Sequence, residues 1–223
     1  MNSKGEAEKS PVLSSASERL CLNLSRGLHA AAQPLAILRA SVGRGQTDRL
    51  SLDELRELLA NSAAEVERVC TLFSGLQQLV SIESVEPHLS PTPIVPLLAQ
   101  VADGVDLLFK ADGMTLGTEL PETCLPAVID GARSQLALSS VLLVAHGVSR
   151  ASDTVELTAT PCSGSVQVVV RNLNSQADTL SAEAQLGMAI AEASIRSQKG
   201  SFSWNLRPFD VQIQLLTAPM AHP

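Results

Sequence analysis

The feature that most constrains the fold of this chain is a narrow, mostly apolar stripe between positions 52 and 80. Steps of three and four alternate without a slip over nine positions: Leu52, Leu55, Leu59, Ser62, Val66, Val69, Phe73, Leu76 and Val80. A stripe this long and narrow is typical of a coiled-coil or helical-bundle surface, because an ordinary globular helix shows a broader apolar face. Ser51 and Glu54 have the spacing of a capping box, so we expect the helix to begin there.

A second stripe of the same kind lies earlier in the chain. Its members are Leu20, Leu24, Leu28, Ala31, Leu35, Leu38 and Val42. Ser15 and Glu18 form another capping-box pattern, which predicts that this helix begins there. We expect residues 1–14 to be a disordered tail. The glycines of segment 43–48 are expected to end this helix, because glycine loses much backbone entropy on folding. The sequence thus predicts an antiparallel two-helix hairpin over residues 15–86. A lone hairpin would leave apolar surface in water, so we expect a homodimer that forms a four-helix bundle.

The second half of the chain has a different pattern. Prolines at positions 87, 91, 93 and 96 end the helical arm near residues 83–86. Helices are expected over 94–109, 132–148 and 181–197, and strands over 115–120, 126–129, 154–160, 166–171, 200–206 and 211–216. The segment Pro161 to Gly164 suits a hairpin turn between two of the strands. This mixture predicts an α+β fold, with an α/β layer sandwich over residues 87–223.

Composition excludes some partners. Only 2% of the residues are aromatic, with four Phe, one Trp and no Tyr, so the core must be aliphatic. Such a chain lacks the aromatic platforms on which single-stranded bases stack. The formal net charge is −7 at pH 7, which also disfavours binding to a phosphate backbone. We therefore expect no nucleic-acid partner.

Targeting and metal-binding signals are also missing from the sequence. Residues 1–15 are polar and mixed in charge, unlike a signal peptide, and the most apolar stretch, 136–148, is too short to span a bilayer. We expect a cytoplasmic protein without membrane contact. The cysteines are scattered and show no C-x-x-C spacing, so we expect reduced thiols packed as small hydrophobes, with no disulfide and no metal site. They are Cys21, Cys70, Cys124 and Cys162.

His29 is the residue of the first helix whose side chain is best suited to take part in a reaction. A neutral imidazole offers a nucleophilic nitrogen near pH 7 and can accept a phosphoryl group. His29 adjoins Leu28, so we expect it on the flank of the bundle, and Pro34 should kink the helix five residues later. From these residues alone, an ordinary surface histidine is the alternative. His88, His146 and His222 have no sequence neighbours that suggest chemistry.

The pattern of His, four residues, Pro and Leu resembles the H-box of bacterial sensor histidine kinases. In that family the motif reads His-Glu-x-x-Thr/Asn-Pro-Leu, and the histidine is phosphorylated and donates to an aspartate of a response regulator. His29, Pro34 and Leu35 match it, whereas Ala30 replaces the acidic residue and Gln33 replaces Thr or Asn. The resemblance implies that His29 is the phosphoacceptor and that Gln33 positions a water molecule. A solvated helix glutamine is the alternative for Gln33.

The second half is similar to the family's ATP-binding domain in layout, but its nucleotide motifs are altered. Ser140 and Val144 stand where the family has the asparagines that hold Mg²⁺ and phosphates, and valine cannot coordinate a hard cation. Asn172 stands in place of the aspartate that reads adenine, and Asn174 in place of a loop glycine. Gly187 is retained. The resemblance therefore implies a degenerate ATPase-like domain without ATP or any other cofactor.

Three functions follow from the resemblance. The first is a histidine phosphotransfer protein that passes a phosphoryl group between response-regulator receiver domains through His29, without binding ATP. The second is a non-catalytic pseudokinase dimer that binds and regulates response regulators or kinases, through the small apolar patch of residues 30–32. The third is an active kinase with a divergent nucleotide site.

Overall fold

The structure is a computed structural model that describes residues 11–47, 49–122 and 126–217, without the side chains of 11–16. The chain divides into two compact units, Met1–Leu76 and Gln77–Pro223. The division falls within the second long helix, whose last turns belong to the second unit.

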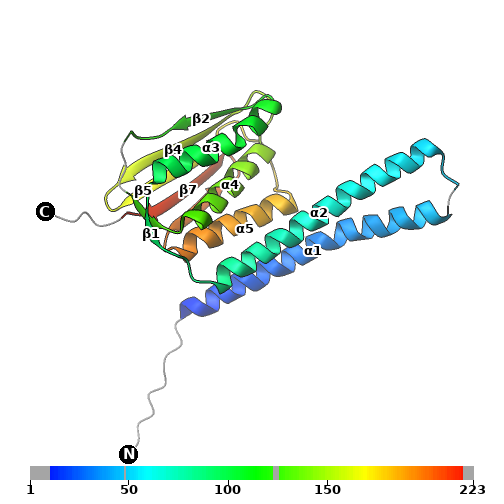
Figure 1. Cartoon of the computed structure of the whole chain (residues 1–223), viewed down its shortest axis with the longest axis horizontal. Helices are drawn as coiled ribbons and strands as arrows, with labels where there is room; N and C mark the ends of the chain where they lie inside the picture. The colour runs from blue at the N-terminus through cyan, green and yellow to red at the C-terminus, as the bar shows by residue number, and fades with distance from the viewer. Residues whose placement is uncertain (1–10, 48, 123–125, 218–223) are drawn as a thin grey trace, which may run out of the picture. The chain divides into compact units, whose positions relative to one another are not determined.

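The first unit is a helical hairpin made by α1 (Pro11–Thr47) and α2 (Leu52–Ser84). The two helices run side by side in opposite directions (Figure 1). Contacts at the two ends agree with this direction. A Cβ added at Gly27 would meet Leu76, and one added at Gly45 would meet Leu58, so higher positions in α1 face lower positions in α2. The predicted antiparallel hairpin is therefore confirmed.

The predicted start of α1 is wrong. The helix already includes residues 11–14, so Ser15 lies inside it and not at its start, while residues 1–10 lie outside the described part. The predicted break after Val42 is also wrong, because α1 continues through Gly43 and Gly45 to Thr47. Thr47 Oγ1 donates to the Gly43 carbonyl at 2.9 Å, and Gly45 lies beside Leu58.

The start of α2 follows the predicted capping box. The Ser51 backbone N–H donates to Glu54 Oε2 at 2.8 Å, and the Glu54 N–H donates to Ser51 Oγ at 3.3 Å. The hydroxyl of Ser51 also donates to Glu54 Oε2. The backbone bond and then the hydroxyl bond lower the pKa of the Glu54 carboxyl. The helix ends at Ser84, inside the predicted range of 83–86.

The apolar stripes divide between two faces of the hairpin. Residues buried inside it are Gly27, Ala31, Pro34, Leu72, Gly75 and Leu76. Residues spaced by seven on another face of each helix are exposed: Leu28, Leu35 and Val42 on α1, and Leu52, Leu59, Val66 and Phe73 on α2. The predicted stripe members at these seven positions therefore do not pack within one hairpin. A single chain leaves two rows of apolar side chains in water.

The second unit combines a five-stranded mixed sheet with three helices, which confirms the predicted α+β class. Its elements in chain order are β1 (Ser90–Thr92), α3 (Ile94–Ala111), β2 (Thr115–Glu119), β3 (Ala127–Ile129), α4 (Gly131–Gly147), β4 (Thr154–Cys162), β5 (Ser165–Asn172), α5 (Ala182–Ser197), β6 (Ser201–Asn205) and β7 (Phe209–Leu216). The sheet order is β2-β4-β5-β7-β6, with only β2 and β4 parallel. Strand β1, in the proline-rich segment, was not expected and pairs with β3 alone.

The turn between β4 and β5 is tighter than predicted. The strands continue to Cys162 and restart at Ser165, which leaves Ser163 and Gly164 as the turn. Gly164 has φ +73°, a left-handed conformation that glycine adopts without steric cost. Gly164 is therefore the residue that allows the tight turn, while Pro161 lies inside β4.

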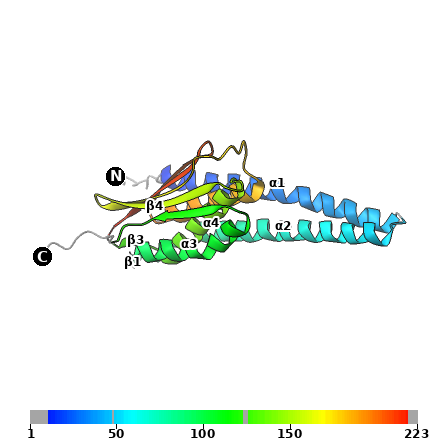
Figure 2. The same cartoon turned by 90° about the horizontal axis from the view of Figure 1, so that it is seen from above.

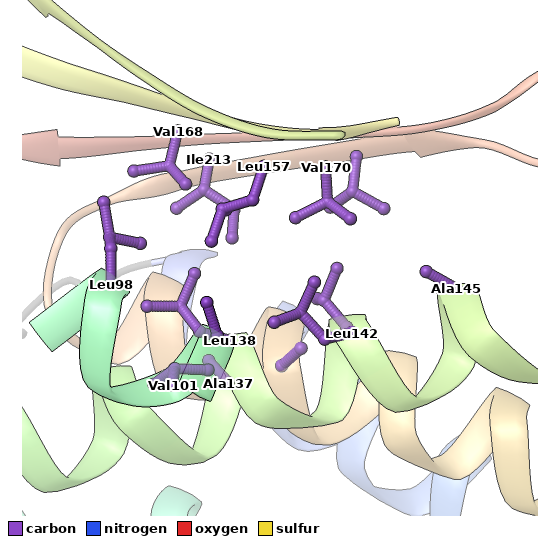
Figure 3. Packing of buried hydrophobic residues seen from close by; sticks show 14 of the residues in the cluster. Leu98, Val101, Ala137, Leu138, Leu142, Ala145, Leu157, Val168, Val170 and Ile213 are labelled. Carbon is purple, nitrogen blue, oxygen red and sulfur yellow. The ribbon is translucent and has the colours of Figure 1, made fainter. Parts of the chain in front are cut away.

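The core lies between the helices and one face of the sheet. Helices α3 and α4 lie on the same side of the sheet (Figures 1 and 2). Figure 3 shows Leu138 and Leu142 of α4 pointing toward Val170 of β5, and all three are at most 1% exposed. Side chains alternate along the strands, so Val155 and Leu157 are buried whereas Glu156 is exposed. This aliphatic core accounts for the low aromatic content.

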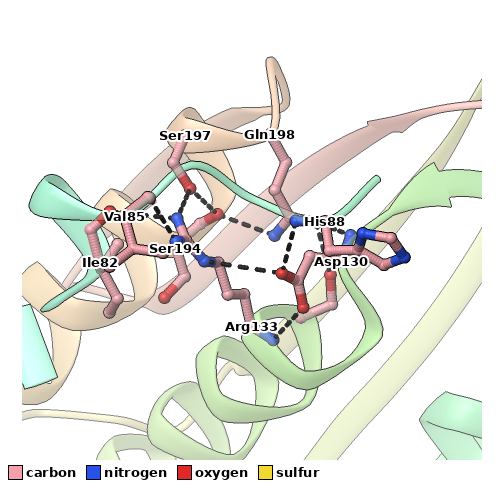
Figure 4. Close-up of polar contacts among 9 residues, drawn as sticks. Ile82, Val85, His88, Asp130, Arg133, Ser194, Ser197 and Gln198 are labelled. Carbon is pink, nitrogen blue, oxygen red and sulfur yellow. Dashed lines mark hydrogen bonds and ion pairs between the residues drawn. The ribbon is translucent and has the colours of Figure 1, made fainter. Parts of the chain in front are cut away.

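A polar cluster fastens the last turns of α2 to α4 and α5 within the second unit (Figure 4). Asp130 caps α4, since Oδ1 accepts from the Arg133 N–H at 3.1 Å and Oδ2 accepts from the His88 N–H at 3.0 Å. The Arg133 guanidinium donates to the carbonyls of Ile82 and Val85 at the end of α2, and to Ser197 Oγ. One arginine thus joins the end of α2 to the start of α4 and the end of α5.

Candidate functional site

His29 lies on the exposed side of α1. It follows the buried Gly27 by two positions, which places the two residues about 200° apart around the helix axis. Within the described part of the chain, no residue forms a hydrogen bond or ion pair with the His29 ring. The imidazole is therefore open to a partner protein and is not held by its own chain.

The neighbours of His29 match the H-box only in part. Gln33 is exposed and lies one turn after His29 on the same face. Ala30 is half-buried, and its methyl group cannot accept a proton. Pro34 lies in the interior of α1 and is buried. It lacks the N–H that would have bonded the carbonyl of Ala30. The helix continues through the proline, so the site lies where the backbone ladder is interrupted.

The positions of the degenerate nucleotide motifs lie against one another. Val144, on α4, is only 5% exposed. A Cβ added at Gly187 of α5 would lie 3.3 Å from Val144 Cγ2 and 4.0 Å from Ser140 Cβ. Helix α5 thus packs directly on α4 at these three positions, and the side chain facing Gly187 is a hydrocarbon without ligand atoms for Mg²⁺.

Asn172 uses its side-chain amide inside the protein. It is fully buried, and Nδ2 donates to Ser149 Oγ at 2.6 Å and to Asp153 Oδ2 at 3.0 Å. Its Oδ1 accepts from the backbone N–H of Asn174 at 2.9 Å, and the Asn174 side chain is exposed. The Arg150 N–H and then the Asn172 amide lower the pKa of Asp153. Sequence reasoning missed Ser149 and Asp153, because no local pattern links them to Asn172.

The loop between β5 and α5 is fastened at several points. Ser175 Oγ donates to the carbonyl of Val148 at 3.4 Å. Arg207, in the turn before β7, donates to the carbonyls of Gln176 and Ala177 and forms an ion pair with Asp178. The loop is thus bonded to the end of α4 and to the β6–β7 turn.

The remaining candidate residues take structural positions. The backbone of His88 bonds Asp130, and His146 Nε2 lies 3.0 Å from Asp112 Oδ2 with its ring edge-on to Phe109. His222 lies outside the described residues. The expectation of buried cysteines is wrong for Cys21, Cys70 and Cys162, which are exposed free thiols, and Cys124 is not described.

The described residues include neither a metal-binding cluster nor a membrane-spanning helix. Over residues 11–47, 49–122 and 126–217, no three His, Cys, Asp or Glu side chains gather in a way that could hold a metal ion. None of the helices in that same part of the chain is both long and apolar enough to cross a membrane.

The chain matches no family model and no curated protein sequence. Its structure is similar to that of the Acinetobacter baumannii histidine kinase AdeS, with TM-score 0.69 and 16% identity over 86% of this chain and 98% of AdeS. The chain has the fold of a sensor histidine kinase core. A histidine kinase from Burkholderia phymatum STM815 shares this fold with TM-score 0.53 and 17% identity, over 87% of this chain and 99% of that chain.

The histidine kinase core fold also occurs in full-length ShkA, solved in complex with AMPPNP. That match has TM-score 0.59 and 18% identity, and it covers 92% of this chain but only 46% of ShkA. These similarities confirm the predicted arrangement of a helical hairpin followed by an ATPase-like α/β sandwich. At this level of identity they establish the fold.

Proposed function

We propose that this chain is a histidine phosphotransfer protein of a two-component phosphorelay, in which His29 carries a phosphoryl group between receiver domains. The observation that carries the proposal is the exposed, unpaired imidazole of His29 on a hairpin helix of the histidine kinase core fold. Such a ring can be approached by a second protein, and its neutral form is nucleophilic near pH 7.

The transfer needs little from this chain besides a positioned nitrogen. An unprotonated ring nitrogen of His29 attacks the phosphorus of an aspartyl phosphate on the donor receiver. The N–P bond forms as the bond from phosphorus to the aspartate oxygen breaks, and the aspartate leaves as a carboxylate. The proton on the other ring nitrogen is then released to water. Reversal of these steps on a second receiver completes the relay, and in-line positioning supplies most of the rate.

Gln33 has a secondary role in this proposal. Its exposed amide lies one turn from His29, where it can orient a water molecule toward the aspartyl phosphate of a docked receiver. Replacement of Gln33 by Ala should lengthen the lifetime of the phosphorylated receiver in the complex and leave transfer to His29 intact.

The proposed relay does without ATP. Val144 fills the space facing Gly187, and Asn172 has its amide bonded to Ser149, Asp153 and the loop backbone. Calorimetry with Mg-ATP should therefore show no heat of binding. Binding with measurable affinity would favour the third function, an active kinase with a divergent site.

The working unit is proposed to be a homodimer. The exposed apolar rows on α1 and α2 repeat every seven residues, which is the spacing of helix–helix contacts in a bundle. Phe73→Glu and Val66→Glu should convert the dimer to monomers in light scattering after gel filtration. Ala64→Glu, exposed about 200° around the helix from Val66, is the matched control and should leave the dimer intact. A monomeric wild type would contradict the dimer.

The proposed partners and location follow from the relay. Receiver domains of response regulators are the donors and acceptors, and we place the chain in the cytoplasm, without a nucleic-acid or membrane partner. Transfer profiling against the receivers of the same cell would identify them.

The relay is tested by mixing the protein with phosphorylated receivers. Wild type should acquire an acid-labile label, His29→Ala should acquire none, and His88→Ala, which changes another exposed histidine, should be labelled like wild type. No label on wild type with any receiver would overturn the relay.

One observation favours the second function, a pseudokinase dimer that binds receivers or kinases without carrying phosphate. Ala30 stands beside His29 where the H-box has its acidic residue, and Leu28 and Leu35 of the same helix are exposed. Intact signalling by His29→Ala, together with loss of signalling by Ala32→Glu, would favour this binding role.

A further inference from the structure

Gly27 marks a point of close approach between the two helices of the hairpin. A Cβ added at this position would lie 2.5 Å from Leu76 Cδ2, 3.1 Å from Cγ and 3.2 Å from Cδ1. A Cβ essentially never comes within 3.0 Å of a non-bonded heavy atom of another residue. The side chain of Leu76 therefore occupies the space that any residue other than glycine would need.

Leu76 has little room to move away. It is 5% exposed, and Leu72, one turn earlier on the same face of α2, is 0% exposed. On α1 the next buried position, Ala31, is 2% exposed. Packing of this kind transmits a change in volume to the backbone, because close-packed interiors contain few voids that could absorb it.

The contact lies directly behind His29. Gly27 faces α2, whereas His29 is two residues further along the same helix and faces water. An α-helix is stiff over two residues, so an outward shift of α1 at Gly27 carries the imidazole with it. Ordinary contact begins near 3.4 Å, so a Cβ at Gly27 and Leu76 Cδ2 would have to move apart by about 1 Å. The part of this shift that the packed Leu76 side chain does not take up must come from α1.

We infer that the contact between Gly27 and Leu76 is a positioning device that sets the depth of His29 relative to a docked receiver. This inference rests on the proposed phosphotransfer. In-line transfer is sensitive to placement, and an error of about 1 Å in a reacting group can cost about 100-fold in rate. Gly27 is thus a positioning residue, and His29 remains the reacting one.

The test compares Gly27→Ala with the double variant Gly27→Ala/Leu76→Ala. Gly27→Ala should slow transfer from a phosphorylated receiver by about 10-fold to 100-fold at saturating receiver. Removal of the Leu76 side chain in the double variant should restore most of that rate. Gly43→Ala is the matched control, because it makes the same substitution in the same helix with no atom within 4 Å, and it should transfer like wild type.

Two readouts separate positioning from a general loss of structure. Alanine forms helix better than glycine, so the helix content of Gly27→Ala should not fall. The spontaneous hydrolysis of phosphohistidine should also be unchanged, since it needs no docked receiver. If Gly27→Ala does not fold, the transfer rate of the double variant against wild type still decides the question.

The outcomes distinguish this inference from the relay on which it rests. An unlabelled wild type overturns the relay itself. A labelled wild type with full-rate transfer by Gly27→Ala overturns the positioning role alone. A slow Gly27→Ala whose folded double variant with Leu76→Ala remains slow also overturns the positioning role.

Discussion

Asp130 and Arg133 hold each other at the first turn of α4. The Arg133 backbone N–H donates to Asp130 Oδ1 at 3.1 Å, and Arg133 Nε lies 3.7 Å from Asp130 Oδ2. The side chains of Asp130 and Arg133 are only 16% and 11% exposed, respectively, so both charges are largely removed from water. Such a pair stabilises the fold only while both partners are present.

Replacement of Arg133 by Ala should therefore destabilise the second unit by about 3 kcal/mol, as it leaves the Asp130 carboxylate without its cation and frees the carbonyls of Ile82 and Val85. Denaturant unfolding measures this. Arg196→Ala is the control, because Arg196 pairs with Glu192 at the surface, and it should cost less than about 1 kcal/mol. Equal losses in the two variants would contradict the importance of the cluster.

Acid should weaken the same cluster. Burial alone would raise the pKa of Asp130. The N–H groups of His88 and Arg133 and the Arg133 guanidinium together lower it by more than burial raises it, so the folded pKa lies below the ordinary 3.8. A carboxyl whose pKa is lower in the folded state than in the unfolded state stabilises the fold fully above the unfolded value. That contribution is lost as the pH falls through the folded value.

The free energy of unfolding of wild type should thus decline below about pH 4. Asp130→Asn should show a lower free energy at pH 7 and a shallower decline. Some decline will remain, because the pKa of Asp153 is lowered too. Urea titrations at several pH values measure both slopes, and an equally steep decline in the variant would count against Asp130.

Restoring the family's aspartate at position 172 should not restore nucleotide binding. Asn172→Asp places a carboxylate at hydrogen-bond distance from Asp153, which now accepts from the Asn172 amide at 3.0 Å. Loss of this buried bond and repulsion between like charges should cost about 1–3 kcal/mol. Asn172→Asp/Asp153→Asn should recover part of this. Mg-ATP binding by Asn172→Asp in calorimetry would contradict this prediction.

Gly200 should not tolerate a side chain. A Cβ there would lie 2.8 Å from the Gln214 carbonyl oxygen of β7 and 2.8 Å from Ile195 Cγ2. The first of these is a backbone atom in the sheet, so Gly200→Ala should lower the free energy of unfolding by about 1–3 kcal/mol. Gly187→Ala, whose Cβ comes nearest to the tip of Val144 at 3.3 Å, should cost less. The reverse order in thermal unfolding would contradict this geometry.

Local patterns predicted most elements because their causes are local. The Ser51–Glu54 box is confirmed, and Ser181 caps α5 by accepting from the Ala184 N–H. The same pattern at Ser15 misled, since a capping pair cannot exclude a helix that already extends upstream to Pro11. Strand β1 escaped prediction because its pairing with β3 joins residues far apart in the sequence.

For the candidate site, too, sequence motifs pointed to individual residues but not to their contacts. The H-box match identified His29 and Gln33, and the altered motifs identified Asn172 and Val144. What Asn172 does could not be read from the sequence, because its partners Ser149 and Asp153 come from another part of the chain. Gly27 gave no signal at all, since a glycine within a helical pattern is ordinary until its neighbour is known.

The sequence by itself determined the two long helices, the α+β order and the histidine at the hairpin, since periodicity and residue chemistry are properties of the chain alone. Only the tertiary structure decided which members of each apolar stripe face inward. A repeat of three and four leaves two neighbouring faces equally apolar, so the choice rests on where the second helix lies. At Gly27 that helix brings Leu76 into the space of an absent side chain, which turns Leu28 and His29 outward.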